Sequence, residues 1–222
     1  SSPPAYQAIP LETLWVGAVG VRNALDIAHR CQARFLQAST SEVYGEPLVH
    51  PQNEEYRGNV SCTGPRSMYD ESKRFSEALI TAYSQQYGVS TAIARIFNTY
   101  GPYMRSDDGR VVTNFLSQIL NGKPLTIYGN GQQTRSFCFV DDTVEGLLSL
   151  LFSQESGPIN IGNPGEFTML ELAETIGQVC GQKPQLTYKP LPGDDPTRRR
   201  PDISAAQKLL GWSPKVPLRE GL

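Results

Sequence analysis

The chain has 222 residues, a formal net charge of -2, and 39% hydrophobic against 19% charged residues. This length suits one sizeable core or two small lobes, and this composition is typical of a globular protein rather than a disordered one. The charge argues against a nucleic-acid or anionic-membrane surface, and no apolar run approaches the ~20 residues that a membrane helix needs.

The first half of the chain predicts alternating helices and strands. Apolar residues at helical spacing indicate helices, and short apolar runs ending in small polar residues indicate buried strands. The expected elements are a helix at 11–30, a strand at 33–40, a Pro- and Gly-rich loop at 45–65, a helix at 66–87 closed by Gly88, and a strand at 90–97. This order favours a parallel sheet with crossover helices.

The second half has shorter elements, and we expect a smaller lobe from about residue 111. Its expected elements are helices at 111–121, 141–153, 168–180 and 203–212, strands around 125–129, 135–140, 158–162 and 185–190, and a charged, proline-rich loop at 190–202. The four cysteines form no CxxC pair and the two histidines have no partner at metal-ligand spacing, so no metal site is expected.

The segment YDESK places Tyr69 and Lys73 four positions apart on the helix of residues 66–87. Residues at this spacing lie on one helical face. A lysine cation near a phenol favours the phenolate and lowers its pKa, which suits proton transfer. The alternative is that Tyr69 packs against the core and Lys73 is a solvated charge.

Three sequence motifs lie at the ends of predicted strands or at the start of the next helix, where they can face one crevice. They are ASTSEVYG after one strand, YDESK at the start of the next helix, and ARIFNTYGP after the next strand. In open α/β sheets, ligands bind outside the carboxyl ends of the strands. With GPRSMYDESKRFSE, LTIYGNGQQTRSF and DDPTRRRPDI, these stretches resemble the extended short-chain dehydrogenase/reductases of nucleotide sugars, and among them the UDP-glucuronate decarboxylases (UDP-xylose synthases).

The resemblance implies an α/β fold with a Rossmann-like, doubly wound parallel sheet. Residues 1–110 would be the C-terminal part of the NAD-binding domain. Residues 111–222 would be mainly a smaller α/β lobe that binds the UDP-sugar, with some segments returning to the sheet. The first strands and the GxxGxxG turn of the family do not occur in this sequence, and we expect the chain to be either a fragment or a truncated isoform.

The family's reaction implies the catalytic roles. Tyr69 would take the proton from the sugar 4-hydroxyl as hydride passes to NAD, Lys73 would lower the tyrosine pKa and hold the nicotinamide ribose, and Thr40 would hydrogen-bond the same oxygen. The resulting β-keto acid loses carbon dioxide, and return of the hydride gives UDP-xylose. Glu42 would either handle a proton in decarboxylation or be a hydrogen-bonded carboxylate at a helix start.

Other reactions of the family fit less well. Dehydratase relatives carry an acidic pair where this chain has Ser41 and Glu42, so Ser41 argues against 4,6-dehydration. A 4-epimerase is a weaker choice as well. The alternative of a different class is a catalytically silent nucleotide-sugar-binding or dimer-partner module. That alternative gains support from Trp15, which stands where the family has a lysine in a helix bordering the active site.

The resemblance also implies binding residues. A planar guanidinium binds phosphate or carboxylate oxygens in a bidentate fork, which favours arginines as ligand contacts. For Arg199 the alternative is a solvated loop, and for Asn23 it is an ordinary helix-surface residue. The expected cofactor contacts are Tyr69, Lys73, Thr99 and Arg110, and the expected substrate contacts are Asn23, Asn98, Arg135 and Arg199.

Family members pair through the helix that carries YxxxK and the helix before it, so we expect a homodimer with a four-helix bundle. The expected location is the cytoplasm, or the Golgi lumen if an N-terminal anchor precedes the chain.

Overall fold

A parallel three-stranded sheet forms the centre of the fold. The computed structural model describes residues 2–191, 193 and 196–222. Strands β1 (Phe35–Thr40), β2 (Thr91–Ile96) and β7 (Ile159–Ile161) pair in the order β1–β2–β7. All of these pairings are parallel, and helices connect the strands. The predicted Rossmann-like parallel sheet with crossover helices is therefore confirmed.

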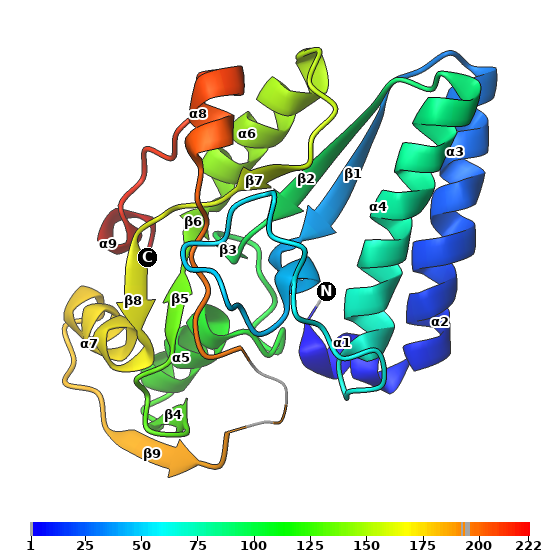
Figure 1. Cartoon of the computed structure of the whole chain (residues 1–222). Coiled ribbons are helices and arrows are strands. Elements are labelled where there is room, and N and C mark those ends of the chain that lie inside the picture. Colours follow the sequence, from blue (N-terminus) through cyan, green and yellow to red (C-terminus); the bar gives the residue numbers. More distant parts are fainter. Residues whose placement is uncertain (1, 192, 194–195) are drawn as a thin grey trace.

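Helices cover both faces of this sheet (Figure 1). On one face, Leu25 of α3 (Val21–Arg30) and Ile80 of α4 (Ser67–Tyr87) are buried together against Ile93 of β2. These apolar residues recur at helical spacing along one side of each helix, which is the pattern that predicted both helices.

On the other face lie α6 (Val140–Phe152) and α8 (Ser204–Leu210). Here Leu150 and Trp212 pack in a second buried cluster with the strand residue Ile161. These helices come from the part of the chain beyond residue 110, as does β7. The proposed division of the chain near residue 110 stays a prediction.

A long helical pair stands beside the sheet (Figure 1). The helix predicted over 11–30 is present as α2 (Pro10–Trp15), a π-helical turn η1 (Val16–Gly20) and α3, and it runs against α4. A Cβ on Gly17 would lie 2.5 Å from Cβ of Ser72, so glycine is what permits this close approach. Within the described part of the chain, no helix is long and apolar enough to cross a membrane.

A separate buried cluster lies around α5 (Val111–Leu120) and α7 (Met169–Val179), in the region expected to form the smaller lobe. The short strands of this region pair as β4 with β9 in parallel, β5 with β8 antiparallel, and β3 with β6 in parallel. The bounds are β3 (Thr99–Tyr100), β4 (Leu125–Tyr128), β5 (Thr134–Ser136), β6 (Cys138–Phe139), β8 (Glu166–Thr168) and β9 (Leu186–Lys189), and α9 (Leu218–Gly221) lies at the end.

One predicted segment differs from the structure, and one helix of the structure lies outside the predicted segments. The single strand expected over 135–140 is divided into β5 and β6, because the two halves pair with different partners. The short helix α1 (Pro3–Ala8) was not predicted. The loop predicted over 190–202 contains residues 192, 194 and 195, which lie outside the described residues.

Candidate active site

A cleft of about 570 Å³ lies where β1 and β2 end. Its walls come from the end of β1, the first turn of α4, the segment after β2, and the lobe beside α5. Most of the residues predicted from the sequence line it, although they come from distant parts of the chain. These are Thr40, Glu42, Tyr69, Lys73, Asn98, Thr99, Arg110, Arg135 and Arg199.

The YDESK segment forms the first turns of α4. Arg66 is the N-cap residue, and Gly88, in the left-handed conformation with φ of 66°, ends the helix. The spacing of four puts Tyr69 and Lys73 on one face of the helix. The Nζ atom of Lys73 lies 5.8 Å from the centre of the Tyr69 ring and donates a hydrogen bond to the Ala38 carbonyl at 2.8 Å.

Burial has the largest effect on the acidity of this pair. It raises the pKa of Tyr69, while the Thr40 side chain and the Arg199 charge oppose the rise. It lowers the pKa of Lys73. The YxxxK spacing predicts a lowered pKa for Tyr69, whereas burial raises it. Burial outweighs the groups that favour the phenolate, and the Lys73 ammonium donates its hydrogen bond to a backbone carbonyl.

Glu42 lies at the centre of a buried arginine–glutamate cluster, which consists of Arg66, Glu42 and Arg199. It belongs to η2 (Ser41–Tyr44), which Thr40 caps by accepting a hydrogen bond from the Glu42 N–H at 3.2 Å. One carboxylate oxygen lies 2.8 Å from Nη2 of Arg66 and the other 2.8 Å from Nη2 of Arg199.

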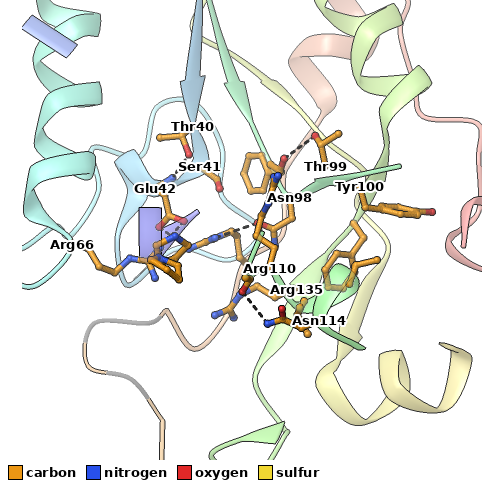
Figure 2. Close-up of a pocket in the computed structure, with 18 of the residues that line it drawn as sticks. Thr40, Ser41, Glu42, Arg66, Asn98, Thr99, Tyr100, Arg110, Asn114 and Arg135 are labelled. Atoms are coloured by element: carbon orange, nitrogen blue, oxygen red, sulfur yellow. Dashed lines mark hydrogen bonds and ion pairs between the residues drawn. The ribbon is translucent and has the colours of Figure 1, made fainter. Parts of the chain in front are cut away.

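The two arginines of the cluster are only 8% and 6% exposed, and Figure 2 shows Arg66 and Glu42 together at one wall of the cleft. Both oxygens of Glu42 are engaged, as the hydrogen-bonded role considered for this residue requires. Proton transfer by Glu42 stays a prediction. Two buried guanidinium groups in a cleft form a site that favours anionic ligands.

The segment after β2 brings two more predicted residues to the cleft (Figure 2). Nη1 of Arg199 lies 3.4 Å from Oδ1 of Asn98, so Asn98 adjoins the arginine–glutamate cluster. The hydroxyl of Thr99 bonds to the Phe97 carbonyl and, at 3.1 Å, to the Thr143 hydroxyl. Thr99 therefore lines the cleft with a hydroxyl that already has protein partners.

The wall formed by the lobe carries two further arginines (Figure 2). Arg110 precedes α5, and its Nη2 donates to a carboxylate oxygen of Asp108 at 3.1 Å. Arg135 lies buried on β5, and its Nη1 donates to the Thr134 carbonyl at 2.8 Å. Their expected contacts with cofactor and phosphate stay predictions.

Two residues singled out in the sequence do not reach the cleft. Asn23 is exposed on α3 and does not line it. Trp15, at the end of α2, is 64% exposed and does not line it either. Both lie on the outer helix of the helical pair, and α4 is the helix of that pair whose first turns reach the cleft. The expectation that the helix borders the active site at Trp15 is therefore wrong, because Trp15 is exposed and does not line the cleft.

The structure adds residues that the sequence did not single out. Arg66 was missed because an arginine before a helix is common on protein surfaces. Tyr6 of α1 stacks on Tyr69, with ring centres 4.8 Å apart and planes 6° from parallel. It lines the cleft and is only 2% exposed, and among the described residues its hydroxyl has no hydrogen-bond partner. Its only signal in the sequence is an aromatic residue after two prolines.

The comparisons with known proteins agree with this geometry. A family model described as the NAD dependent epimerase/dehydratase family matches residues 1–162. The chain is 55% identical to UDP-glucuronic acid decarboxylase 6 of Arabidopsis thaliana, with all of this chain and 65% of the relative covered. It is 52% identical to UDP-glucuronic acid decarboxylase 1 of Danio rerio, of which it covers 53%. The chain therefore spans about half to two thirds of the length of these relatives.

Solved structures share the fold. One is a UDP-glucose 4-epimerase from Thermotoga maritima with UDP-glucose, with a TM-score of 0.91, 26% identity, and 100% of this chain and 71% of the other covered. Another is a UDP-glucuronic acid 4-epimerase from Bacillus cereus in complex with UDP-glucuronic acid and NAD, with a TM-score of 0.83 and 29% identity over 92% of this chain and 64% of the other. The sequence match, the shared fold and the cleft at the strand ends agree, and the chain belongs to the NAD dependent epimerase/dehydratase family.

Proposed function

We propose that this chain carries the catalytic cleft of a UDP-glucuronate decarboxylase, which uses NAD to convert UDP-glucuronate to UDP-xylose and carbon dioxide. The observation that carries the proposal is that the arginine–glutamate cluster and the Tyr69–Lys73 pair line one cleft. The cluster offers charged donors to an anionic sugar, and the pair offers a proton-transfer group. The names of the plant and fish relatives support the same reaction.

The residues of the cleft fit the nicotinamide side of NAD. The hydroxyl of Tyr6 is buried without a partner among the described residues, which leaves a polar group in the wall available to a ligand. Tyr69 and Lys73 would hold the nicotinamide ribose, with Thr99 and Arg110 as further cofactor contacts. The sequence contains no GxxGxxG turn, and the proposed cofactor contacts are those with the nicotinamide ribose.

The chain's residues would act on the sugar as follows. Bound NAD supplies the acceptor and donor of hydride at C4. Tyr69 moves the proton of the sugar 4-hydroxyl, and Thr40 hydrogen-bonds the same oxygen. Arg66 and Arg199 orient the carboxylate that leaves as carbon dioxide while C5 takes up a proton from water, and Glu42 keeps both guanidinium groups in place. Asn98 and Arg135 bind the sugar or the diphosphate.

The test is to incubate the protein with UDP-glucuronate and NAD and to measure carbon dioxide and UDP-xylose. Tyr69→Phe should abolish product, because it removes the proton-transfer group and leaves the ring stack with Tyr6. Tyr83→Phe is the matched control, since Tyr83 lies on the same helix and bonds Asp26 away from the cleft. Formation of UDP-galacturonate instead of UDP-xylose would refute decarboxylation in favour of 4-epimerisation.

We also propose that two copies of the chain pair through the helical pair. Leu11, Trp15 and Val19 recur every four residues along α2 and η1, and all three are exposed. Phe75 of α4 is also exposed. An apolar stripe of this kind on two adjacent helices is what a four-helix bundle between two copies buries. The π-helical turn η1 carries Val19, the last residue of the stripe.

The dimer is tested by sedimentation of variants. Phe75→Lys should shift the protein toward the monomer, because it places a charge in the apolar surface that the proposed bundle buries. Leu120→Lys, at an exposed leucine of α5, is the control and should leave the mass unchanged. A Phe75→Lys protein that keeps the dimer mass would refute this surface.

For the location we propose the cytoplasm. All four cysteines lie in the described part of the chain and are unpaired, which supports a reducing compartment. A fluorescent fusion that co-localises with a Golgi marker would contradict this.

A further inference from the structure

A buried network of side chains runs behind the cleft, outside its lining. It consists of Glu77, Arg95, Tyr44 and Asn160, and none of the four lines the cleft. Glu77 lies one helical turn after Lys73 on α4. Its carboxylate accepts two hydrogen bonds from Arg95 of β2, at 3.0 and 2.7 Å, and a third from Ser39 of β1 at 2.6 Å. The catalytic face of α4 is thereby bonded to both strands that end at the cleft.

The network continues from β2 to β7 through a tyrosine. Nη1 of Arg95 donates to the Tyr44 hydroxyl at 3.1 Å, and its guanidinium lies 4.9 Å from the centre of the same ring. The hydroxyl in turn donates to Oδ1 of Asn160 at 2.8 Å. Burial raises the pKa of Tyr44 to about 12, so the hydroxyl keeps the proton that this bond needs.

Asn160 carries the network to the segment that presents Arg199. Its side chain is completely buried, and its Nδ2 donates to the carbonyls of Gln52 and Asp202, both at 3.0 Å. The backbone of Gln52 is in turn bonded to Arg200 and Asp202 at 2.9 and 2.8 Å. Arg199 directly precedes Arg200 in the chain, and its side chain reaches Glu42 in the cleft.

We propose that the buried network is a positioning device, which holds the Tyr69–Lys73 face of α4 and the side chain of Arg199 at a fixed separation across the cleft. The proposal rests on the proposed function, because it assigns a catalytic consequence to that separation. Every polar group of the path is satisfied within the protein, and such networks specify a single arrangement of the elements they join. Catalytic groups on two separate elements need a fixed separation, because a displacement of about 1 Å can lower the rate on the order of a hundredfold.

The variant that tests the network is Tyr44→Phe. It removes the hydroxyl between Arg95 and Asn160 but keeps the ring, the Glu77–Arg95 ion pair and every residue that lines the cleft. Tyr83→Phe is the matched control, because it removes a tyrosine hydroxyl with one side-chain partner from α4 outside the network. Both proteins are compared with the unsubstituted one by amide hydrogen exchange and by steady-state kinetics with UDP-glucuronate and NAD.

We expect Tyr44→Phe to exchange the amides of Gln52 and Asp202 faster, and to lower kcat by on the order of tenfold with KM changed less than twofold. Tyr83→Phe should change none of these. The double variant Tyr44→Phe, Arg199→Lys should lose less kcat/KM than the product of the losses of the two single variants. Both substitutions disturb the position of the Arg199 side chain, so their effects are not independent.

Unchanged exchange at the two amides, an unchanged kcat, or strictly multiplicative losses would each overturn the network proposal. If the unsubstituted protein makes no UDP-xylose, the proposed function fails. Hydrogen exchange then still decides whether Tyr44 is coupled to the segment that carries Arg199.

Discussion

Asp70 offers a sharp test of the electrostatics around the cleft, because it is a buried carboxyl next to Tyr69 in the chain. It is 7% exposed, and one of its oxygens has no hydrogen-bond partner among the described residues. Burial, followed by the nearby charge of Glu42, raises its pKa from 3.8 to about 7, against the opposing charges of Arg66 and Arg199. Between about pH 4 and pH 7, the folded protein therefore keeps a proton on Asp70 that the unfolded chain has lost.

The sign and size of the effect follow from proton linkage. Below about pH 4 both states are protonated and Asp70 does not change stability with pH. Between about pH 4 and pH 7 only the folded state keeps the proton, so the free energy of unfolding falls as the pH rises, and it levels off above pH 7. A pKa difference of about three at about 1.4 kcal/mol each gives a loss on the order of 4 kcal/mol by pH 8. Asp70→Asn carries no titrating group and escapes this loss.

The assay is urea unfolding of the two proteins from pH 4.5 to pH 8. The variant's free energy of unfolding, minus that of the unsubstituted protein, should rise by on the order of 3 kcal/mol across this range, because about 1 kcal/mol of the loss has already occurred at pH 4.5. Asp107→Asn is the control, because Arg105 holds the pKa of that exposed carboxyl below its usual value. Asp107 is therefore ionised in both states throughout this range, and the difference in free energy of unfolding for this variant should not change with pH. A difference between Asp70→Asn and the unsubstituted protein that does not change with pH would refute the reasoning.

Three further variants test the packing of α4 against its neighbours and the role of the Thr40 hydroxyl. Gly17→Ala should destabilise the protein by about 1–3 kcal/mol in urea unfolding, because its Cβ would meet Ser72 at 2.5 Å, and an unchanged midpoint would contradict the close approach. Ile80→Ala, at a completely buried site, should cost about 2–5 kcal/mol by the same assay, and a loss below 1 kcal/mol would contradict the packing of α4 on the sheet. Thr40→Val should lower UDP-xylose formation by on the order of a hundredfold, since the hydroxyl beside Tyr69 is lost while the side-chain shape is kept, and full activity would exclude that hydroxyl from the reaction.

The elements that the sequence predicted well are those whose cause is local. The strand runs at 33–40 and 90–97 are short apolar runs with polar residues at their ends, which is typical of strands in a parallel sheet, and both strands formed. The strand expected over 135–140 shows the limit of this reasoning. Composition marks the segment as extended, but its division into β5 and β6 depends on which distant strands come alongside.

The same distinction explains the candidate site. Tyr69 and Lys73 share a helix, so a spacing of four along the chain is enough to place them together. Glu42, Arg66 and Arg199 meet only because the end of β1, the start of α4 and the segment before α8 come to the same cleft, and Glu42 and Arg199 are 157 positions apart. An arginine among three in a charged loop looks like a solvated residue until its carboxylate partner is seen. Asn23 is the reverse case, because the family pattern allowed a position near the substrate or on an ordinary helix surface, and in the structure Asn23 is exposed on α3 and does not line the cleft. Sequence patterns therefore specify the part of the site that one helix carries, whereas the anion-binding part depends on tertiary contacts that the buried network behind the cleft joins together.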